Sequence, residues 1–384
     1  MYISSMKIRN WKNFTMANIE LHETMYMIGP NAAGKSNFLD IFRFMRDIVN
    51  PKGGGLQQAL NSRGGMRKTR SLAARKQPQI ELEFELRESL LTQSGHPDWK
   101  YILWIKSETR GKHRPLVMKE EAYKLGRRIF SRPDPRDLQD QERLTQTHLE
   151  QINMNADYRH IAQFFEKVLY LHLVPQLLKY SDQISLRHLE SDPFGQGFLE
   201  EIAAATEYIR VSRLNKIEEI LIKVIPNLRK LRFVRDLVSG RPHLEMLYSH
   251  WRPNAGWQRE DQFSDGTLRL IAIIWTLLST NSMILLEEPE LSLHKKVVEQ
   301  IPSLIYKTRQ SRRKSGGQIL ISTHSTDLLS SGSFSGNFFL LKPGSGGEGT
   351  RIEVPSDQDV AAMKAGLTPA DILLPKTSSS IGGL

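Results

Sequence analysis

The 384 residues of this chain exceed the usual size of one compact domain, and their formal net charge of +11 at pH 7 suggests acidic partners, most commonly nucleic acid. The absence of cysteine excludes disulfides and thiol chemistry. The longest apolar run, residues 270–279, is too short to span a bilayer, and the start of the sequence has no signal-peptide pattern. We therefore expect a soluble, cytoplasmic protein without a membrane partner.

The N-terminal region predicts a nucleotide site. Residues 2–21 alternate enough to indicate two strands around a turn at Lys12–Asn13. Residues 27–40, "MIGPNAAGKSNFLD", have G-x-x-x-x-G-K-S spacing between a short buried strand and a helix. A glycine-rich turn at a helix N-terminus forms an anion-binding nest, in which the lysine reaches the β- and γ-phosphates and the serine binds Mg²⁺. The predicted nucleoside triphosphate loop consists of Gly29, Pro30, Asn31, Ala32, Ala33, Gly34, Lys35, Ser36 and Asn37.

A basic stretch without acidic residues follows the predicted helix. Its candidates for nucleic-acid contact are Arg63, Arg67, Lys68, Arg70 and Arg75, and a second acid-free cluster occupies residues 307–314. Such clusters are typical either of contacts with a phosphate backbone or of solvated loops, and the sequence leaves both interpretations open.

The middle of the chain predicts mixed architecture. Residues 78–125 read as an antiparallel sheet, residues 130–165 as helix and loop, and residues 197–228 as two amphipathic helices. A hairpin turning at Ser239–Gly240 comes next. From residue 267 onward, helices alternate with short apolar strands, which favours an α/β fold with a largely parallel sheet.

Three further stretches carry candidate site residues. In "SMILLEEPELSLH", residues 282–294, a predicted buried strand ends at Glu287 and Glu288, where one acid can hold Mg²⁺ and a second can deprotonate the attacking water. His324 follows another predicted strand, at the sheet edge where ligands bind in α/β proteins. Ser264 and Gly266 precede a long apolar helix whose first turn could bind a second phosphate, although Ser264 or Asp265 could equally be a plain N-cap.

The order of these motifs resembles the ABC-type ATPase heads of the SMC/RecF/OLD group. The resemblance covers about the first 40 residues, including "MKIRNWKNF", and residues 260–330 with "FSDGTLR", "ILLEEPELSLH" and "STHS". It implies an α/β ABC-type P-loop ATPase head with a mostly parallel core sheet, an antiparallel β subdomain and an inserted helical subdomain. We expect an N-terminal lobe at 1–130, a helical insertion at 131–235 and a C-terminal lobe at 236–384.

Carried over to this sequence, the resemblance implies ATP and Mg²⁺ as cofactors. Lys35 and Ser36 would hold phosphate and Mg²⁺, Glu287 would stand at the usual aspartate position, Glu288 would polarise water, and His324 would be the switch histidine. Ser264 and Gly266 would contact the nucleotide of a second subunit, and Lys12 and Asn13 would lie near the nucleotide. The glutamine of the superfamily stays unassigned among Gln57, Gln58 and Gln176.

Departures from the transporter pattern bear on the biological role. S-D-G-T replaces S-G-G-Q, Glu-Glu-Pro-Glu replaces Asp-Glu-Pro, and His294 stands where transporters carry an aspartate; the first two favour OLD-like ATPases. We therefore expect an ATPase whose nucleotide-driven dimerisation acts as a DNA-related switch, in anti-phage defence with a separate nuclease or toxin effector. A RecF-like repair clamp is the alternative, and a transporter energy subunit is a third. Because only about 60 residues follow His324, we expect no nuclease activity from this chain alone.

Overall fold

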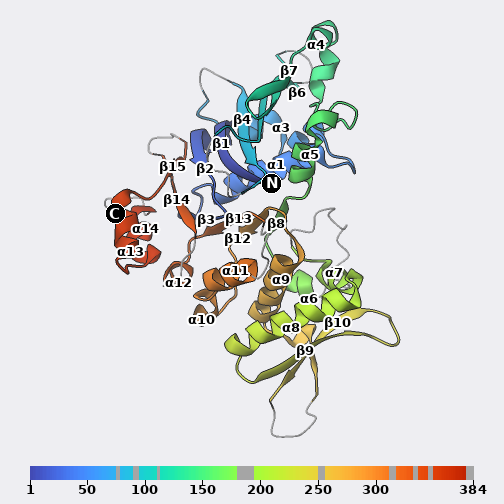
Figure 1. The fold of residues 1–384 in the computed structure, drawn as a ribbon, viewed down its shortest axis with the longest axis vertical. Helices are drawn as coiled ribbons and strands as arrows, with labels where there is room; N and C mark the ends of the chain where they lie inside the picture. Colours follow the sequence, from blue (N-terminus) through green and yellow to red (C-terminus); the bar gives the residue numbers. More distant parts are fainter. Residues whose placement is uncertain are drawn as a thin grey trace.

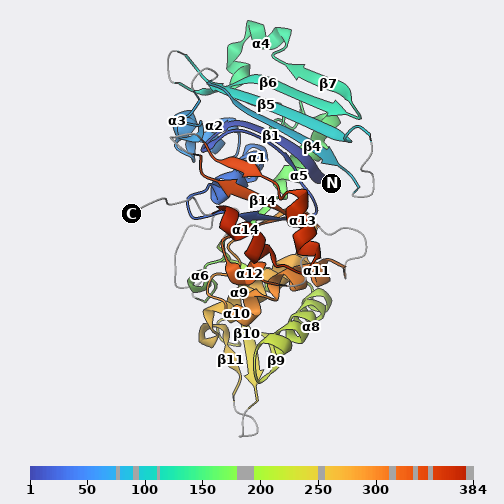
Figure 2. The ribbon, with the colours of Figure 1, turned by 90° about the vertical axis from the view of Figure 1, so that its left-hand side faces the viewer.

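The structure, a computed structural model, describes residues 1–74, 78–89, 95–109, 113–179, 194–249, 256–310, 317–331, 336–344 and 349–377. Along the long axis of the molecule, an antiparallel sheet lies at one end, a mostly parallel sheet in the middle, and a small three-stranded sheet at the other end (Figure 1, Figure 2).

The antiparallel sheet has six strands in the order β2–β1–β4–β5–β6–β7. Its strands are β1 (Tyr2–Trp11), β2 (Phe14–Glu20), β4 (Ile80–Arg87), β5 (Trp99–Ser107), β6 (Pro115–Lys124) and β7 (Arg127–Arg132). In β4, four buried apolar residues alternate with half-buried charged ones, which is the period of a strand with one face in the core. The predicted antiparallel sheet is confirmed, and the N-terminal strand pair joins it because β1 pairs with β4.

The core sheet has the order β15–β14–β3–β13–β12–β8, and every pair except β14–β15 is parallel. Its strands are β3 (Thr24–Ile28), β8 (Leu169–Leu171), β12 (Ile284–Glu287), β13 (Ile319–Thr323), β14 (Asn337–Lys342) and β15 (Arg351–Glu353). Strands from distant parts of the chain thus lie side by side, and the carboxyl ends of the five parallel strands share one edge.

Helices cover both faces of this sheet. On one side, α1 (Lys35–Val49) packs between the core sheet and the antiparallel sheet, and Phe42 of this helix contacts Phe84 of β4. On the other side, α9 (Asp265–Ser279) and α11 (Ile301–Gln310) pack against the alternate residues of the same strands. Neighbouring residues of each buried strand therefore belong to two different cores, which explains their continuous apolar runs.

The helices and hairpin predicted between residues 197 and 248 are confirmed. They are α7 (Phe198–Ala204), α8 (Glu207–Val224), β9 (Leu228–Arg235) and β10 (Pro242–Tyr248), with β11 (Gln258–Arg259) pairing on the outer edge of β10. Figure 1 shows this lobe at the end opposite the antiparallel sheet.

Strand pairing departs from the predicted domain boundaries. The boundary at 130/131 falls inside β7, and the boundary at 235/236 separates β9 from its hairpin partner β10. In addition, β8, from the segment expected to be a helical insertion, forms the edge strand of the core sheet beside β12. These boundaries would cut hydrogen-bonded ladders, so they do not divide the structure into separate units.

Short helices complete the fold. They are α2 (Leu56–Asn61), α3 (Gly65–Thr69), α4 (Pro135–Gln139), α5 (Arg159–Glu166), α6 (Pro175–Lys179), α10 (Lys295–Val298), α12 (Thr326–Leu329), α13 (Asp357–Lys364), α14 (Pro369–Thr377) and the 3₁₀ turns η1 (Gln141–Thr145), η2 (Ala156–Tyr158) and η3 (Glu260–Gln262). Of all the helices in the described ranges, none has the length and apolarity needed to cross a membrane.

Candidate nucleotide site

The glycine-rich loop connects the end of β3 to the start of α1. Gly34 is the N-cap of α1, and no described side chain caps this helix end. At Gly34, φ is +99°, and a Cβ atom would lie 2.0 Å from Nδ2 of Asn13; a Cβ on Gly29 would lie 2.8 Å from the carbonyl oxygen of Leu341. The loop thus needs glycine at both positions, and it leaves the first amides of a 15-residue helix available for an anion.

The side chain of Lys35 is hydrogen-bonded to the backbone of the glycine-rich loop. Its Nζ donates to the carbonyl oxygens of Gly29 at 2.8 Å and Pro30 at 3.1 Å. Burial lowers the pKa of Lys35, while the nearby carboxylates of Glu288, Glu290 and Glu287 act in the opposite direction. These contacts keep the ammonium group curled over the loop, where a phosphate could replace the two carbonyls as its partner.

The turn between β1 and β2 braces the same loop through Asn13. Its Nδ2 donates to the carbonyl of Ala33 at 3.2 Å and to Oγ1 of Thr350 at 2.6 Å, and Nδ2 of Asn37 donates to Oδ1 of Asn13 at 2.8 Å. Lys12 of the same turn points elsewhere, because its ammonium pairs with Asp40 of α1 at 2.7 Å. Asn13 therefore lies on the loop as expected, whereas Lys12 is engaged on the helix.

Ser36 and Glu287, the predicted Mg²⁺ ligands, are in direct contact. The hydroxyl of Ser36 donates to Oε1 of Glu287, and the hydroxyl of Tyr170, from β8, donates to Oε2. Burial, followed by the bond to Glu287, raises the pKa of Tyr170, so this hydroxyl keeps its proton at neutral pH. Sequence reasoning missed Tyr170; one tyrosine in the otherwise aliphatic run of β8 was the available signal.

Glu288 and His324 meet at the carboxyl ends of β12 and β13. Oε1 of Glu288 lies 3.0 Å from Nδ1 of His324. Glu288 has a φ of +44°, which costs a residue with a side chain about 1–2 kcal/mol. Two backbone contacts hold it there: its amide donates to the carbonyl of Ser322 at 3.0 Å, and its carbonyl accepts from Arg269 of α9 at 2.9 Å.

Glu290 is a further residue of this edge that sequence reasoning did not assign. It is buried, and burial raises the pKa of its carboxyl group. Its Oε1 accepts from Oγ1 of Thr323 at 2.6 Å and from the amide of His324 at 3.4 Å. Glu290 therefore ties the segment after β12 to the segment that carries the histidine.

The predicted second phosphate-binding end is at the start of α9. Ser264 is the N-cap of this helix, and its Oγ accepts from the amide of Thr267 at 3.2 Å. Ser264 is exposed, and a Cβ on Gly266 would lie 2.5 Å from the carbonyl oxygen of Ser292. Asp265 pairs with Lys179 at 2.6 Å. Within a single chain, Ser264 therefore acts as an N-cap. Because it is exposed, it also remains accessible to a second molecule.

The three candidate glutamines have different surroundings. Gln57 donates to two backbone carbonyls, of Pro115 at 2.8 Å and Thr145 at 2.6 Å, which gives it a structural role. Gln176 follows β8 and donates to Asp265 at 3.3 Å, and Gln58 lines a separate pocket beside α1. His294 caps α10 through its Nδ1, which accepts from the amide of Lys296.

The basic stretch divides into buried and exposed residues. Arg63, which was predicted as a nucleic-acid contact, has a side chain that is only 8% exposed and pairs with Asp40 at 2.9 Å and Asp47 at 2.8 Å, so its contacts here are structural. Arg67 and Lys68, in α3, are exposed and available, and Arg70 is half-buried. Arg75 lies outside the described residues, as does the second cluster from residue 311 onward.

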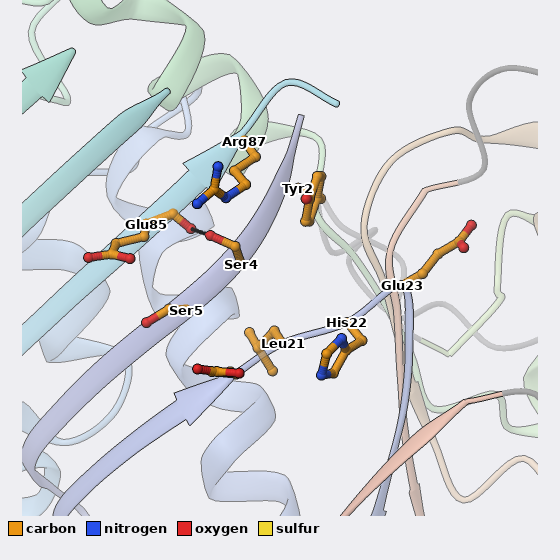
Figure 3. A pocket seen from close by; sticks show the side chains of 9 residues that line it. Tyr2, Ser4, Ser5, Leu21, His22, Glu23, Glu85 and Arg87 are labelled. Carbon is orange, nitrogen blue, oxygen red and sulfur yellow. Dashed lines mark hydrogen bonds between the residues drawn. The ribbon is translucent and has the colours of Figure 1, made fainter. Parts of the chain in front are cut away.

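A separate pocket of about 500 Å³ opens where β1 begins and β2 and β4 end, near the start of β3 (Figure 3). Its lining side chains are mixed in character: Tyr2, Ser4, Ser5, Glu20, Leu21, His22, Glu23, Glu85 and Arg87. None of them belongs to the motifs described above, so this pocket is distinct from the candidate nucleotide site.

The donor set at the sheet edge fits a magnesium nucleotide. Phosphate and Mg²⁺ require three kinds of group, and all three are present here. They are a glycine loop whose neighbours leave no room for side chains, a lysine that turns toward this loop, and a hydroxyl next to a carboxylate. These groups come from the loop after β3, from α1 and from β12, and the topology of the core sheet brings them together.

Comparisons with known proteins agree with this geometry. A family model described as "AAA domain, putative AbiEii toxin, Type IV TA system" matches residues 25–330. No curated protein matches the sequence.

Solved structures of SMC heads share the fold. The SMC head bound to the C-winged helix domain of ScpA is similar over 94% of this chain and 100% of that chain, with a TM-score of 0.56 and 13% identity. The SMC head with an extended coiled coil bound to the C-terminal domain of ScpA, derived from Pyrococcus furiosus, is similar over 95% and 98%, with a TM-score of 0.50 and 12% identity. At these identities the likeness is one of fold, and it confirms the predicted ABC-type P-loop architecture.

Proposed function

This chain belongs to the family described as "AAA domain, putative AbiEii toxin, Type IV TA system", and on this premise we propose that it binds and hydrolyses ATP and acts as a nucleotide-driven dimerisation switch. One observation carries the proposal. The phosphate-loop residues Lys35 and Ser36 lie at the same sheet edge as Glu287, and Glu288 and His324 meet 3.0 Å apart on the adjoining strands.

Binding is assigned to the loop and to the start of α1. The amides of the first turn of α1 and the Lys35 ammonium would surround the phosphates, after Lys35 exchanges its two carbonyl partners for phosphate oxygens. Ser36 and Glu287 would hold Mg²⁺, which would offset charge on the phosphates when bound. Asn13 would fix the loop from the outside through its bond to the Ala33 carbonyl.

Hydrolysis is assigned to the pair of Glu288 and His324. The Glu288 carboxylate would accept a proton from the attacking water, and the hydrogen bond from His324 would set the orientation of the carboxylate. The strained backbone of Glu288, held by the Arg269 and Ser322 contacts, would aim its side chain off the strand toward the loop.

Dimerisation is assigned to the start of α9, where Ser264 is exposed and Gly266 is buried behind it. Ser264 and Gly266 would approach the γ-phosphate of a nucleotide bound to a second copy, which would complete each site only in a dimer. Asp265, already paired with Lys179, would keep the helix start in shape without entering the site.

We assign the biological output to a separate effector in a DNA-related defence system. The wording "putative AbiEii toxin, Type IV TA system" in the family description supports the defence role, and the net charge of +11 with the exposed Arg67 and Lys68 supports the link to DNA. A RecF-like repair clamp is the second candidate, favoured by the same exposed basic residues, and the two differ in whether ATP-bound dimers engage an effector protein or DNA alone.

The decisive experiment measures ATP hydrolysis of the purified full chain against protein concentration, together with its mass by light scattering. Hydrolysis per protomer that rises with concentration, and a doubled mass with ATP and Mg²⁺, are expected. As a matched pair, Ser264→Ala should lose the concentration dependence, while Ser62→Ala, at another exposed helix end, should keep it. A rate per protomer that is constant over a hundredfold range of concentration would contradict the dimer switch.

A further inference from the structure

Glu287 holds two hydroxyl donors, of which only one belongs to the phosphate loop. Ser36 donates to its Oε1 and Tyr170 donates to its Oε2. Both oxygens of this buried carboxylate are therefore committed to fixed directions. If Ser36 turns to bind a metal ion, Tyr170 is the donor that still holds the Glu287 carboxylate by a hydrogen bond.

A glutamate at the tip of β12 needs such a second donor. Glutamate has one more side-chain torsion than aspartate, so its carboxylate can rotate through more positions, and ordering it costs more conformational entropy. The backbone of Glu287 is fixed by strand pairing, but a strand still leaves several side-chain rotamers accessible. A hydrogen bond to the far oxygen does select them.

The position of Tyr170 in β8 suits this task. In the parallel register, Tyr170 pairs with Leu285, two residues before Glu287, an offset of about 6.6 Å along the strand. The long phenol ring spans this offset, so its hydroxyl reaches the carboxylate from the neighbouring strand. A serine or threonine at residue 170 would be too short to do so.

The ring itself is clamped from the side of α1. The guanidinium of Arg43 lies over it, 4.2 Å from the ring centroid, and Arg43 in turn lies 3.8 Å from Asp40. Asp40 is buried and also pairs with Lys12 at 2.7 Å. A run of contacts therefore leads from the β1–β2 turn through α1 to Glu287, and it fixes the ring that carries the hydroxyl.

We propose that Tyr170 is a positioning residue that presets the Glu287 carboxylate for a divalent cation. The proposal rests on the function proposed above and assigns to that site a residue from the edge strand of the core sheet. Removing a hydrogen-bond partner of a metal-ligating side chain typically weakens metal affinity 10–100-fold. Tyr170→Phe keeps the ring and its contact with Arg43 and removes only the hydroxyl.

The test measures Mn²⁺ affinity by electron paramagnetic resonance on the full chain with a non-hydrolysable ATP analogue. Tyr170→Phe should weaken Mn²⁺ binding at least about 10-fold, while binding of the analogue in EDTA stays within about twofold of wild type. Tyr158→Phe is the matched control, because the Tyr158 hydroxyl is buried and has no hydrogen-bond partner among the described residues. This control should bind Mn²⁺ as the wild type does.

A double-variant comparison separates positioning from general damage. With Glu287→Ala as the background, Tyr170→Phe should cause no further loss of Mn²⁺ affinity, since its only target there is gone. Unchanged Mn²⁺ affinity in Tyr170→Phe, a loss that persists in the Glu287→Ala background, or an equal loss of analogue binding in EDTA would each overturn the inference. Failure of the wild type itself to bind the analogue would instead overturn the proposed nucleotide site.

Discussion

Replacing Arg63 with alanine tests whether this residue stabilises the fold or contacts nucleic acid. Arg63 donates to both oxygens of Asp40, to Asp47 and to the carbonyl of Ala59. Asp40 and Arg63 are 7% and 8% exposed, so the pair is shielded from solvent. Arg63→Ala would leave Asp40 buried with Lys12 at 2.7 Å and Arg43 at 3.8 Å as its remaining cations.

The expected cost follows from this remaining compensation. Removing one partner of a buried ion pair typically costs about 3–5 kcal/mol, and the Lys12 contact places Arg63→Ala at the low end, about 3 kcal/mol. With a urea dependence of about 3 kcal/mol per molar, the unfolding midpoint should fall by ~1 M. Arg67→Ala, at an exposed site in the next helix, should change the unfolding free energy by less than about 0.5 kcal/mol.

The pH dependence of this loss provides an internal check. Burial alone would raise the pKa of Asp40, but the charge and hydrogen bonds of Arg63, followed by Lys12, hold it below its usual value. A depressed pKa contributes stability above the unfolded-state value of about 3.9, and this contribution is lost as pH falls through the folded-state pKa. The difference between wild type and Arg63→Ala should therefore be full at pH 7 and shrink below about pH 4. Coincident urea curves at pH 7 would refute the assignment of Arg63 to the fold.

Four further predictions concern the site and its surface. Lys35→Ala should abolish measurable ATP binding by calorimetry, because no other described ammonium lies on the loop; wild-type affinity would be incompatible with the loop assignment. Glu288→Gln should slow ATP turnover by about 10²–10⁴-fold while ATP-bound dimers accumulate, with the exposed Glu219→Gln as control, and normal turnover would move the base elsewhere. Gly34→Ala should lose nucleotide binding while keeping its fold by circular dichroism, because the new Cβ meets Asn13 at φ +99°; retained binding would argue against the tight loop. Neutralising Arg67 and Lys68 together should flatten the salt dependence of DNA binding by about two slope units, and an unaltered slope would mark α3 as a solvated surface.

The sequence by itself determined the elements and their chemistry. The G-x-x-x-x-G-K-S spacing, the apolar run ending at Glu287 and Glu288, and the run ending before His324 each specify a strand end with defined side chains, because periodicity and glycine positions are local properties. The alternation of helices and strands also indicated an α/β fold, since such an alternation has few packing solutions. The order of the motifs indicated an ABC-type head through its resemblance to known ATPase heads.

Tertiary structure decided which charges are available. The basic stretch looks uniform in sequence, yet Arg63 is buried against two aspartates of α1 while Arg67 and Lys68 are exposed. No local pattern distinguishes them, because the partners of Arg63 lie 23 and 16 residues away. The same reason explains Lys12, which shares a turn with Asn13 but pairs with Asp40 on the helix.

Tertiary structure also decided which strands are neighbours, and with them the surroundings of Glu287. Tyr170 of β8 lies 117 residues before Glu287 in the sequence. Only the parallel pairing of β8 with β12 brings these two side chains together. Strand neighbours in a parallel sheet are set by crossovers and by which faces must be buried, which are long-range properties of the whole chain. Sequence periodicity can therefore predict that a residue lies on a strand, whereas the identity of the neighbouring strand depends on the packing of the complete fold.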